Sequence, residues 1–114
     1  MDHDYEDQKA ETYQIFGQIK GKHSLPATAV VEYQFIPMEG EADWKAFSKA
    51  AKAAGYSTAE FPDEDYIEIS TAPITLDAET IWQHEKALTE MALDTGFDPD
   101  GWGFTVVAHQ DPAV

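Results

Sequence analysis

The sequence predicts an α+β fold in which two helices cover one face of a four-stranded antiparallel sheet, with an extra helix at the N-terminus. The main observation behind this prediction is the element order, which reads β-α-β-β-α-β from residue 28 onward. The length of 114 residues and the hydrophobic fraction of 43% indicate a single domain, residues 1–114. A chain of this size can bury a core without metal or disulfides.

The N-terminal helix is predicted at about residues 4–20. Asp4 can cap its first turn, and Gly21 is expected to end it. One face of this helix should pack against the rest of the domain. Its residues recur at helical spacing and are Thr12, Ile15, Phe16 and Ile19.

The first strand and the second helix follow at residues 28–36 and at about 41–54. Alternation along the strand puts its bulky apolar residues on one face and Glu32 and Gln34 on the other. Gly55 is well placed to end the helix. The apolar positions are Val31, Tyr33 and Phe35 in the strand and Trp44, Phe47, Ala51 and Ala54 in the helix.

A β-hairpin comes next. Its strands are predicted at residues 56–61 and 66–71, with a turn at residues 62–65 between them. Pro73 is expected to break the second strand, because proline cannot donate a ladder hydrogen bond.

A third helix and a last strand complete the predicted core. Asp77 can cap this helix, which should run to about Thr95, and residues 102–109 form the strand. The apolar stripe of the helix is Ala78, Ile81, Leu88, Met91 and Ala92. With right-handed crossovers, this order gives a ferredoxin-like core at about residues 28–109.

The charge restricts the classes of partner. The chain has 22 Asp plus Glu against seven Lys and no Arg, so its formal net charge is −15. Such a surface repels phosphates, and we expect no direct binding to nucleic acid or to an anionic membrane. A basic protein would be attracted, with salt-sensitive association; the alternative is that the charge only maintains solubility. The absence of Cys and of a long apolar run indicates a soluble cytoplasmic protein.

No residue pattern indicates catalysis, a metal site or a cofactor, so none is predicted. The histidines are isolated, and His84 is interpreted as a half-buried or surface residue rather than a base or ligand. The acidic run at residues 63–65 lacks the glycine and ligand spacing of a calcium loop and is interpreted as a solvated turn. The carboxylates selected for contact with a basic partner are Glu32, Glu68, Asp63, Glu64 and Asp65.

The most distinctive segment of the chain is Asp98-Pro99-Asp100-Gly101-Trp102-Gly103. Its Pro-Asp-Gly part favours a tight turn, and two glycines around a Trp suggest close packing of the backbone around a fixed indole. Trp102 is either a core residue at the start of the last strand or a partly exposed anchor at a protein interface. The candidate interaction residues of this segment are Asp100, Gly101, Trp102 and Gly103.

Three places in the sequence resemble the RraB family of ribonuclease E regulators: Ala53-Ala54-Gly55-Tyr56, Leu76-Asp77-Ala78 and Asp100-Gly101-Trp102-Gly103. The resemblance implies a non-catalytic protein that binds the basic scaffold region of ribonuclease E, without binding RNA, and lowers RNA cleavage. The chain departs from the family pattern in two ways. Pro99 stands where an aromatic residue is expected, and the sequence stops at Val114 without the long acidic tail of better-known members.

Two other functions remain open from the sequence. A ligand-binding domain would need a pocket, expected between the N-terminal helix and the sheet and lined by polar groups such as His84, Tyr66 or His109. An oligomeric module would pair through the open face of the sheet and form a homodimer.

Overall fold

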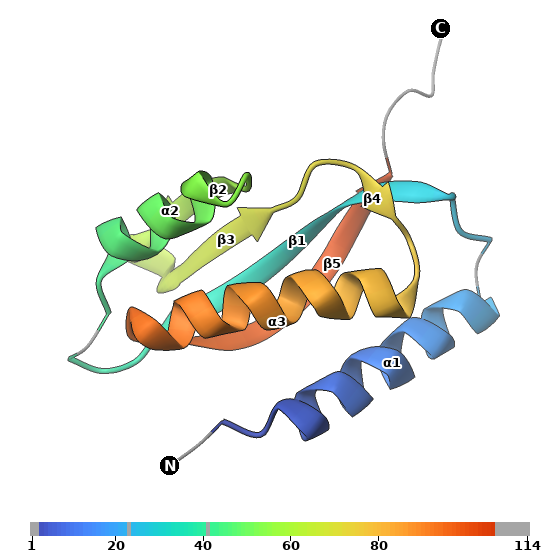
Figure 1. Ribbon diagram of the computed structural model, residues 1–114, viewed down its shortest axis with the longest axis horizontal. Coiled ribbons are helices and arrows are strands. Elements are labelled where there is room, and N and C mark those ends of the chain that lie inside the picture. The colour runs from blue at the N-terminus through green and yellow to red at the C-terminus, as the bar shows by residue number, and fades with distance from the viewer. Residues whose placement is uncertain (1–2, 23, 41, 107–114) are drawn as a thin grey trace, which may run out of the picture.

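A computed structural model describes residues 3–22, 24–40 and 42–106. Within them the chain forms three α-helices, a short 3-10 helix and a five-stranded antiparallel sheet (Figure 1). The elements in chain order are α1 (Tyr5–Lys22), β1 (Thr28–Pro37), α2 (Trp44–Ala53), β2 (Ser57–Phe61), the 3-10 helix (Pro62–Glu64), β3 (Tyr66–Ser70), β4 (Ile74–Thr75), α3 (Ala78–Asp94) and β5 (Phe97–Val106). The chain is therefore an α+β protein.

β1 is the central strand of the sheet. β5 pairs along one side of it, and β3 followed by β4 pairs along the other. β2 pairs with β3, so β2 and β5 form the two edges in the described part of the chain. The sequence does not predict β4, because Pro73 marks the end of β3; Ile74 and Thr75 nevertheless return to the same side of β1.

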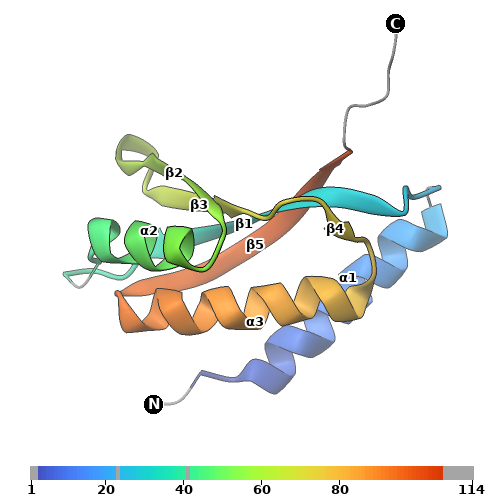
Figure 2. The same cartoon turned by 45° about the horizontal axis from the view of Figure 1, so that its top comes forward.

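The hydrophobic core lies between the sheet and the two helices α2 and α3 (Figure 2). Both helices are capped by aspartates: Asp43 accepts a hydrogen bond from the amide of Ala46 at 3.0 Å, and Asp77 from that of Thr80 at 2.8 Å. Burial of each large apolar side chain contributes about 1.5–3 kcal/mol. The fully buried residues include Val31, Tyr33, Phe35, Phe47, Ile67, Ile69, Ile81 and Leu88.

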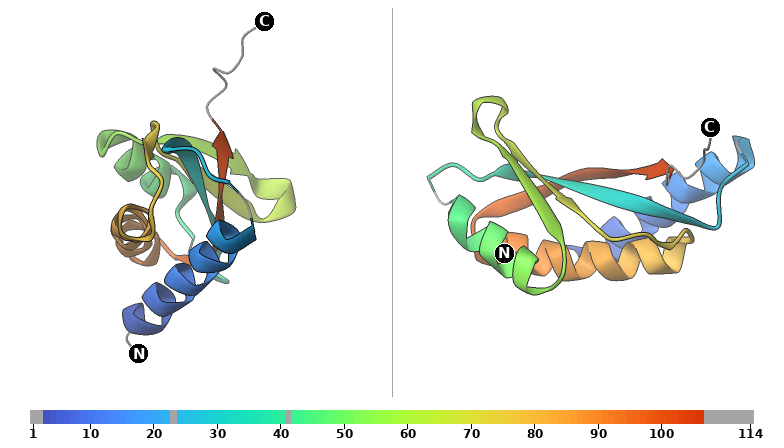
Figure 3. Two further views of the ribbon diagram at one scale, coloured as in Figure 1. Left: turned by 90° about the vertical axis from the view of Figure 1, so that its right-hand side faces the viewer. Right: turned by 90° about the horizontal axis from the view of Figure 1, so that it is seen from above.

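α1 lies alongside α3, on the side of the domain next to β5 (Figure 3). Its first turn is capped as predicted, because the carboxylate of Asp4 accepts a hydrogen bond from the amide of Asp7 at 3.0 Å. The helix continues past Gly21 to Lys22, so the prediction that Gly21 ends it is wrong. A glycine inside a helix costs about 1 kcal/mol relative to alanine and is tolerated near an end.

The packing face of α1 is narrower than predicted. Thr12 and Phe16 are buried, but Ile15 is 41% exposed. The reason is that α1 contacts mainly one neighbouring helix, α3, so only the residues aligned with that contact are covered.

β5 begins at Phe97, earlier than predicted, and the predicted tight turn at residues 98–101 is wrong. Pro99 and Gly101 pair with consecutive residues of β1, which leaves Asp100 as the extra residue of a β-bulge. An edge strand accommodates this sequence because one of its sides has no partner strand that requires amide donors. Residues 107–109, the end of the predicted strand, lie outside the described residues.

Substitution of Phe97 tests whether β5 begins at this residue, with its side chain in the core. Its side chain is fully buried, and its ring centroid lies 5.1 Å from those of both Trp44 and Phe47. Phe97→Ala is expected to lower the free energy of unfolding by about 3–5 kcal/mol, because it removes a buried ring and leaves a cavity. Ile36→Ala, at an exposed position of β1, should cost less than about 1 kcal/mol in the same urea titration. Similar losses for the two variants would contradict the placement of Phe97 in the core.

Candidate functional site

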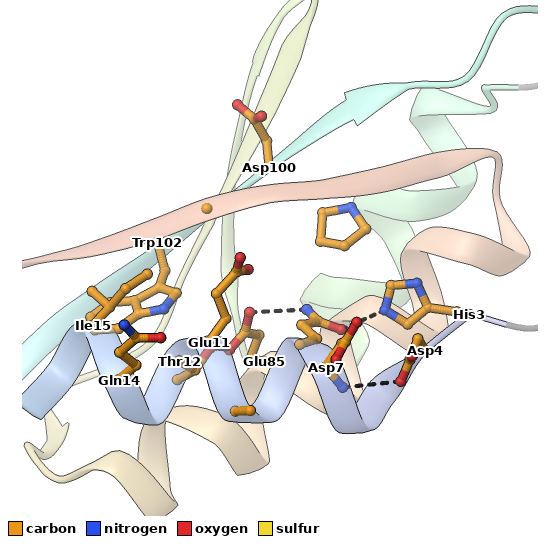
Figure 4. Close-up of a pocket in the computed structure, with 14 residues that line it drawn as sticks. His3, Asp4, Asp7, Glu11, Thr12, Gln14, Ile15, Glu85, Asp100 and Trp102 are labelled. Atoms are coloured by element: carbon orange, nitrogen blue, oxygen red, sulfur yellow. Dashed lines mark hydrogen bonds between the residues drawn. The ribbon is translucent and has the colours of Figure 1, made fainter.

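A cleft of about 820 Å³ lies between the first half of α1 and the bulged part of β5 (Figure 4). α1 forms one wall, residues 99–102 form the other, and the buried Glu85 of α3 lies at its base. The cleft is located where the sequence predicts a pocket, between the N-terminal helix and the sheet.

The cleft is strongly acidic. The residues that direct carboxylates toward it are Asp4, Asp7, Glu11 and Glu85. Asp100 borders the cleft with its carboxylate turned away, His3 also lines it, and in the described part of the chain no lysine does. Lys9 of the same helix lies at a separate depression, with its Nζ 5.8 Å from the centroid of the Tyr13 ring. The cleft therefore concentrates negative potential and suits a cationic ligand.

Glu85 is the centre of a hydrogen-bond network that joins α1 to α3. Its carboxylate accepts hydrogen bonds from the hydroxyl of Thr12 at 2.5 Å and from the side-chain amide of Gln8 at 2.9 Å. The same amide lies 3.0 Å from the hydroxyl of Thr89, and the Gln8 carbonyl oxygen lies 2.6 Å from Nε2 of His3. These contacts fix the position of α1 beside the cleft.

Glu85 is a buried acid whose carboxylate is hydrogen-bonded to neutral groups and not to a cation. Burial raises its pKa, and the hydrogen bonds from Thr12 and Gln8 only partly oppose this effect. Sequence reasoning missed Glu85, because a charged residue in an amphipathic helix is usually exposed. Its spacing from Trp82 and Thr89 was the available signal, since all three lie on a second buried stripe of α3.

Trp102 packs partly in the core, as one interpretation of the sequence predicts, and its role as an interface anchor stays a prediction. It is half-buried and packs against the core, and it also lines the cleft beside Ile15 (Figure 4). Asp100 points away from α1, on the other side of β5. Gly101 and Gly103 pair with β1 residues that face away from the helices, so they lie on the open face of the sheet.

The other predicted carboxylates lie elsewhere. On the open face, Glu32 accepts a hydrogen bond from Thr105 at 2.8 Å, and Glu68 accepts one from Gln34 at 3.2 Å. The acidic residues 63–65 are exposed in the turn between β2 and β3. This turn belongs to the edge of the sheet opposite β5, away from α1 (Figure 3). The structure therefore does not bring the predicted interaction residues together on one surface.

The polar groups predicted for a ligand pocket do not converge on the cleft. His84 is half-buried, its Nδ1 lies 2.7 Å from the hydroxyl of Tyr56, and burial lowers its pKa. Tyr66 stacks on Phe61 on the open face of the sheet, with ring centroids 4.7 Å apart. His109 lies outside the described residues. Within the described ranges, no three His, Asp or Glu side chains form a group that could hold a metal ion.

The raised pKa of Glu85 predicts a pH dependence of stability. The folded protein keeps a proton on Glu85 at pH values at which the unfolded chain, with an ordinary pKa of 4.5, has released it. The resulting contribution to stability is complete below the unfolded pKa and is lost as the pH rises through the folded one. Glu85→Gln should remove this contribution, which urea denaturation at about pH 4 to 8 measures.

Glu90→Gln is the matched control, because Glu90 is exposed on the same helix and its substitution changes the net charge by the same amount. The stability of Glu90→Gln should still decline as the pH rises, as that of the unchanged chain does, whereas the stability of Glu85→Gln should not show this decline. Identical pH profiles for the two variants would contradict the assignment of this decline to Glu85.

The chain is similar to a known protein family over most of its length. In the described part of the chain, no helix is long and apolar enough to cross a membrane. None of the curated proteins compared with the chain matches it. The family model described as "Regulator of ribonuclease activity B" matches residues 9–104, from the first half of α1 to the second half of β5. The match includes Glu85 and the β5 wall of the cleft and the α1 wall from residue 10 onward, whereas lining residues 3–8 precede it. The chain therefore belongs to the RraB family.

Proposed function

We propose that this chain is a non-catalytic cytoplasmic regulator that binds the basic scaffold region of ribonuclease E and lowers the RNA-cleaving activity of that enzyme. The observation that carries the proposal is the match of a ribonuclease-regulator family over residues 9–104. The name of the family supports regulation of a ribonuclease, and the choice of ribonuclease E follows the resemblance in sequence.

The charge supports a protein partner rather than RNA. A net charge of −15, without any arginine, opposes phosphate binding and attracts a basic polypeptide. A regulator of this kind would occupy RNA-binding segments of the enzyme and compete with RNA by mass action.

The cleft between α1 and β5 is the surface we assign to this contact. Its lining includes Asp100, Gly101 and Trp102, and the carboxylates of Asp7 and Glu11 from α1 and of Glu85 from α3 gather there beside the indole. Glu32, Glu68 and Gly103 on the open face would extend the contact across β5, whereas residues 63–65 would contribute only long-range attraction.

We also infer that residues 1–114 form one domain with a ferredoxin-like core. The strand order β2-β3-β1-β5, with β4 continuing β3 and two helices on one face, supports this arrangement. A homodimer through the open face is disfavoured, because it would bring Glu32 and Glu68 of two acidic copies together.

Binding to purified ribonuclease E tests the proposed function. We expect the chain to bind the full-length enzyme and not a version that lacks the basic scaffold region. Affinity should fall by about tenfold or more between low and moderate salt, because exposed charges are screened. RNA cleavage by the full-length enzyme should fall as the chain is added. Absence of binding at low salt, or equal binding to the truncated enzyme, would refute the proposal.

Charge reversal at two places tests the assigned surface. The pair Asp7→Lys and Glu11→Lys changes the cleft, and the pair Asp63→Lys and Glu64→Lys changes the β2–β3 turn by the same net charge. All four residues are exposed, so both variants should fold. The cleft pair should weaken binding by about tenfold or more and the turn pair by about threefold or less. Equal losses would show that only the overall charge matters.

A further inference from the structure

The cleft contains a buried acid for which the described chain supplies no bonded cation. Glu85 is 6% exposed, and its hydrogen-bond donors Thr12 and Gln8 are neutral. The negative charge of Glu11 acts on it from α1, and His3 partly offsets this charge but is hydrogen-bonded to Gln8 and not to Glu85. A buried carboxylate is stabilised most by a cation that hydrogen-bonds to it. The nearest lysine of α1, Lys9, lies at a different depression. A cation hydrogen-bonded directly to Glu85 would therefore come from the partner.

An aromatic surface lies next to these carboxylates. Trp102 is held on one side by the core, and the rest of its indole lines the cleft (Figure 4). In the same view, Glu11 rises from α1 into the cleft and Glu85 lies behind it, both to one side of the indole. A planar guanidinium can stack on an indole and donate several hydrogen bonds to carboxylates at its edge at the same time, whereas a lysine ammonium has no planar face to stack and no fork of paired donors.

We propose that the cleft between α1 and β5 is a receptor for an arginine side chain of a basic partner, with the guanidinium stacked on the indole of Trp102 and hydrogen-bonded to the carboxylates of Glu11 and Glu85. This proposal rests on the proposed function for the presence of a basic partner. It adds that the site distinguishes arginine from lysine, which charge attraction alone does not do.

Peptide pairs of equal charge provide the test. The probe is a flexible Gly-Ser peptide of about a dozen residues with three arginines, and its twin carries three lysines at the same positions; such linkers behave as flexible coils. Calorimetric titration should show binding of the arginine peptide about tenfold tighter than binding of its twin, because only guanidinium combines stacking with paired hydrogen bonds. Equal affinities would overturn the proposal.

Matched variants locate the binding site. Glu11→Gln should lower the affinity for the arginine peptide by about fivefold or more. Glu6 is an exposed carboxylate outside the cleft on the same helix, and Glu6→Gln should change this affinity by less than about twofold. Trp102→Leu should reduce the ratio of the affinities for the arginine and lysine peptides to near one, and Trp102→Phe should keep part of the preference for arginine. Should the leucine variant fail to fold, the comparison of Glu11 with Glu6 still decides, because equal effects of these two substitutions would overturn the site.

The outcome separates this inference from the proposed function. If Glu11→Gln binds full-length ribonuclease E as tightly as the unchanged chain, the arginine site is refuted and the ribonuclease partner stands. If the arginine peptide binds as expected but ribonuclease E does not, the site stands and the proposed partner is refuted.

Discussion

The position of α1 depends on one buried carboxylate. The buried residues of α1 are Thr12 and Phe16, so hydrophobic contact alone specifies its docking weakly. Glu85 adds a stricter condition, because a buried acid must be hydrogen-bonded and only a docking that presents Thr12 and Gln8 to it meets this requirement. The cleft exists because this docking holds α1 against α3 rather than against β5.

The same carboxylate connects stability with ligand binding. In the described structure Glu85 is desolvated, which favours its protonated form, and the hydrogen bonds from Thr12 and Gln8 only partly oppose this effect. A cation that enters the cleft would favour the ionised form instead, so binding would be linked to release of a proton. A chain with a net charge of −15 has few cations of its own for this purpose, and an external cation therefore finds little competition.

Short-range signals predicted the fold well, and long-range contacts account for the errors. Asp4 and Asp77 cap their helices as predicted, and Gly55 follows α2 with a φ of 99°, because such signals act within one turn. β4 was missed because its pairing depends on a distant strand. Glu85 was missed because its burial depends on α1, about 70 residues earlier in the chain. The location of the cleft was anticipated, but its residues were not.

The bulge in β5 shows how a tertiary contact overrides a local turn signal. Side chains alternate along a strand, so Phe97 and Trp102, which lie five positions apart, would face opposite sides of a regular strand. The extra residue Asp100 reverses the alternation, and both aromatic side chains then face the helices. Burial of Phe97 and partial burial of Trp102 stabilise this arrangement by more than a local turn could. The bulge thus orients the indole toward the cleft and leaves Gly101 and Gly103 on the open face, so that residues 98–103 contribute to two surfaces.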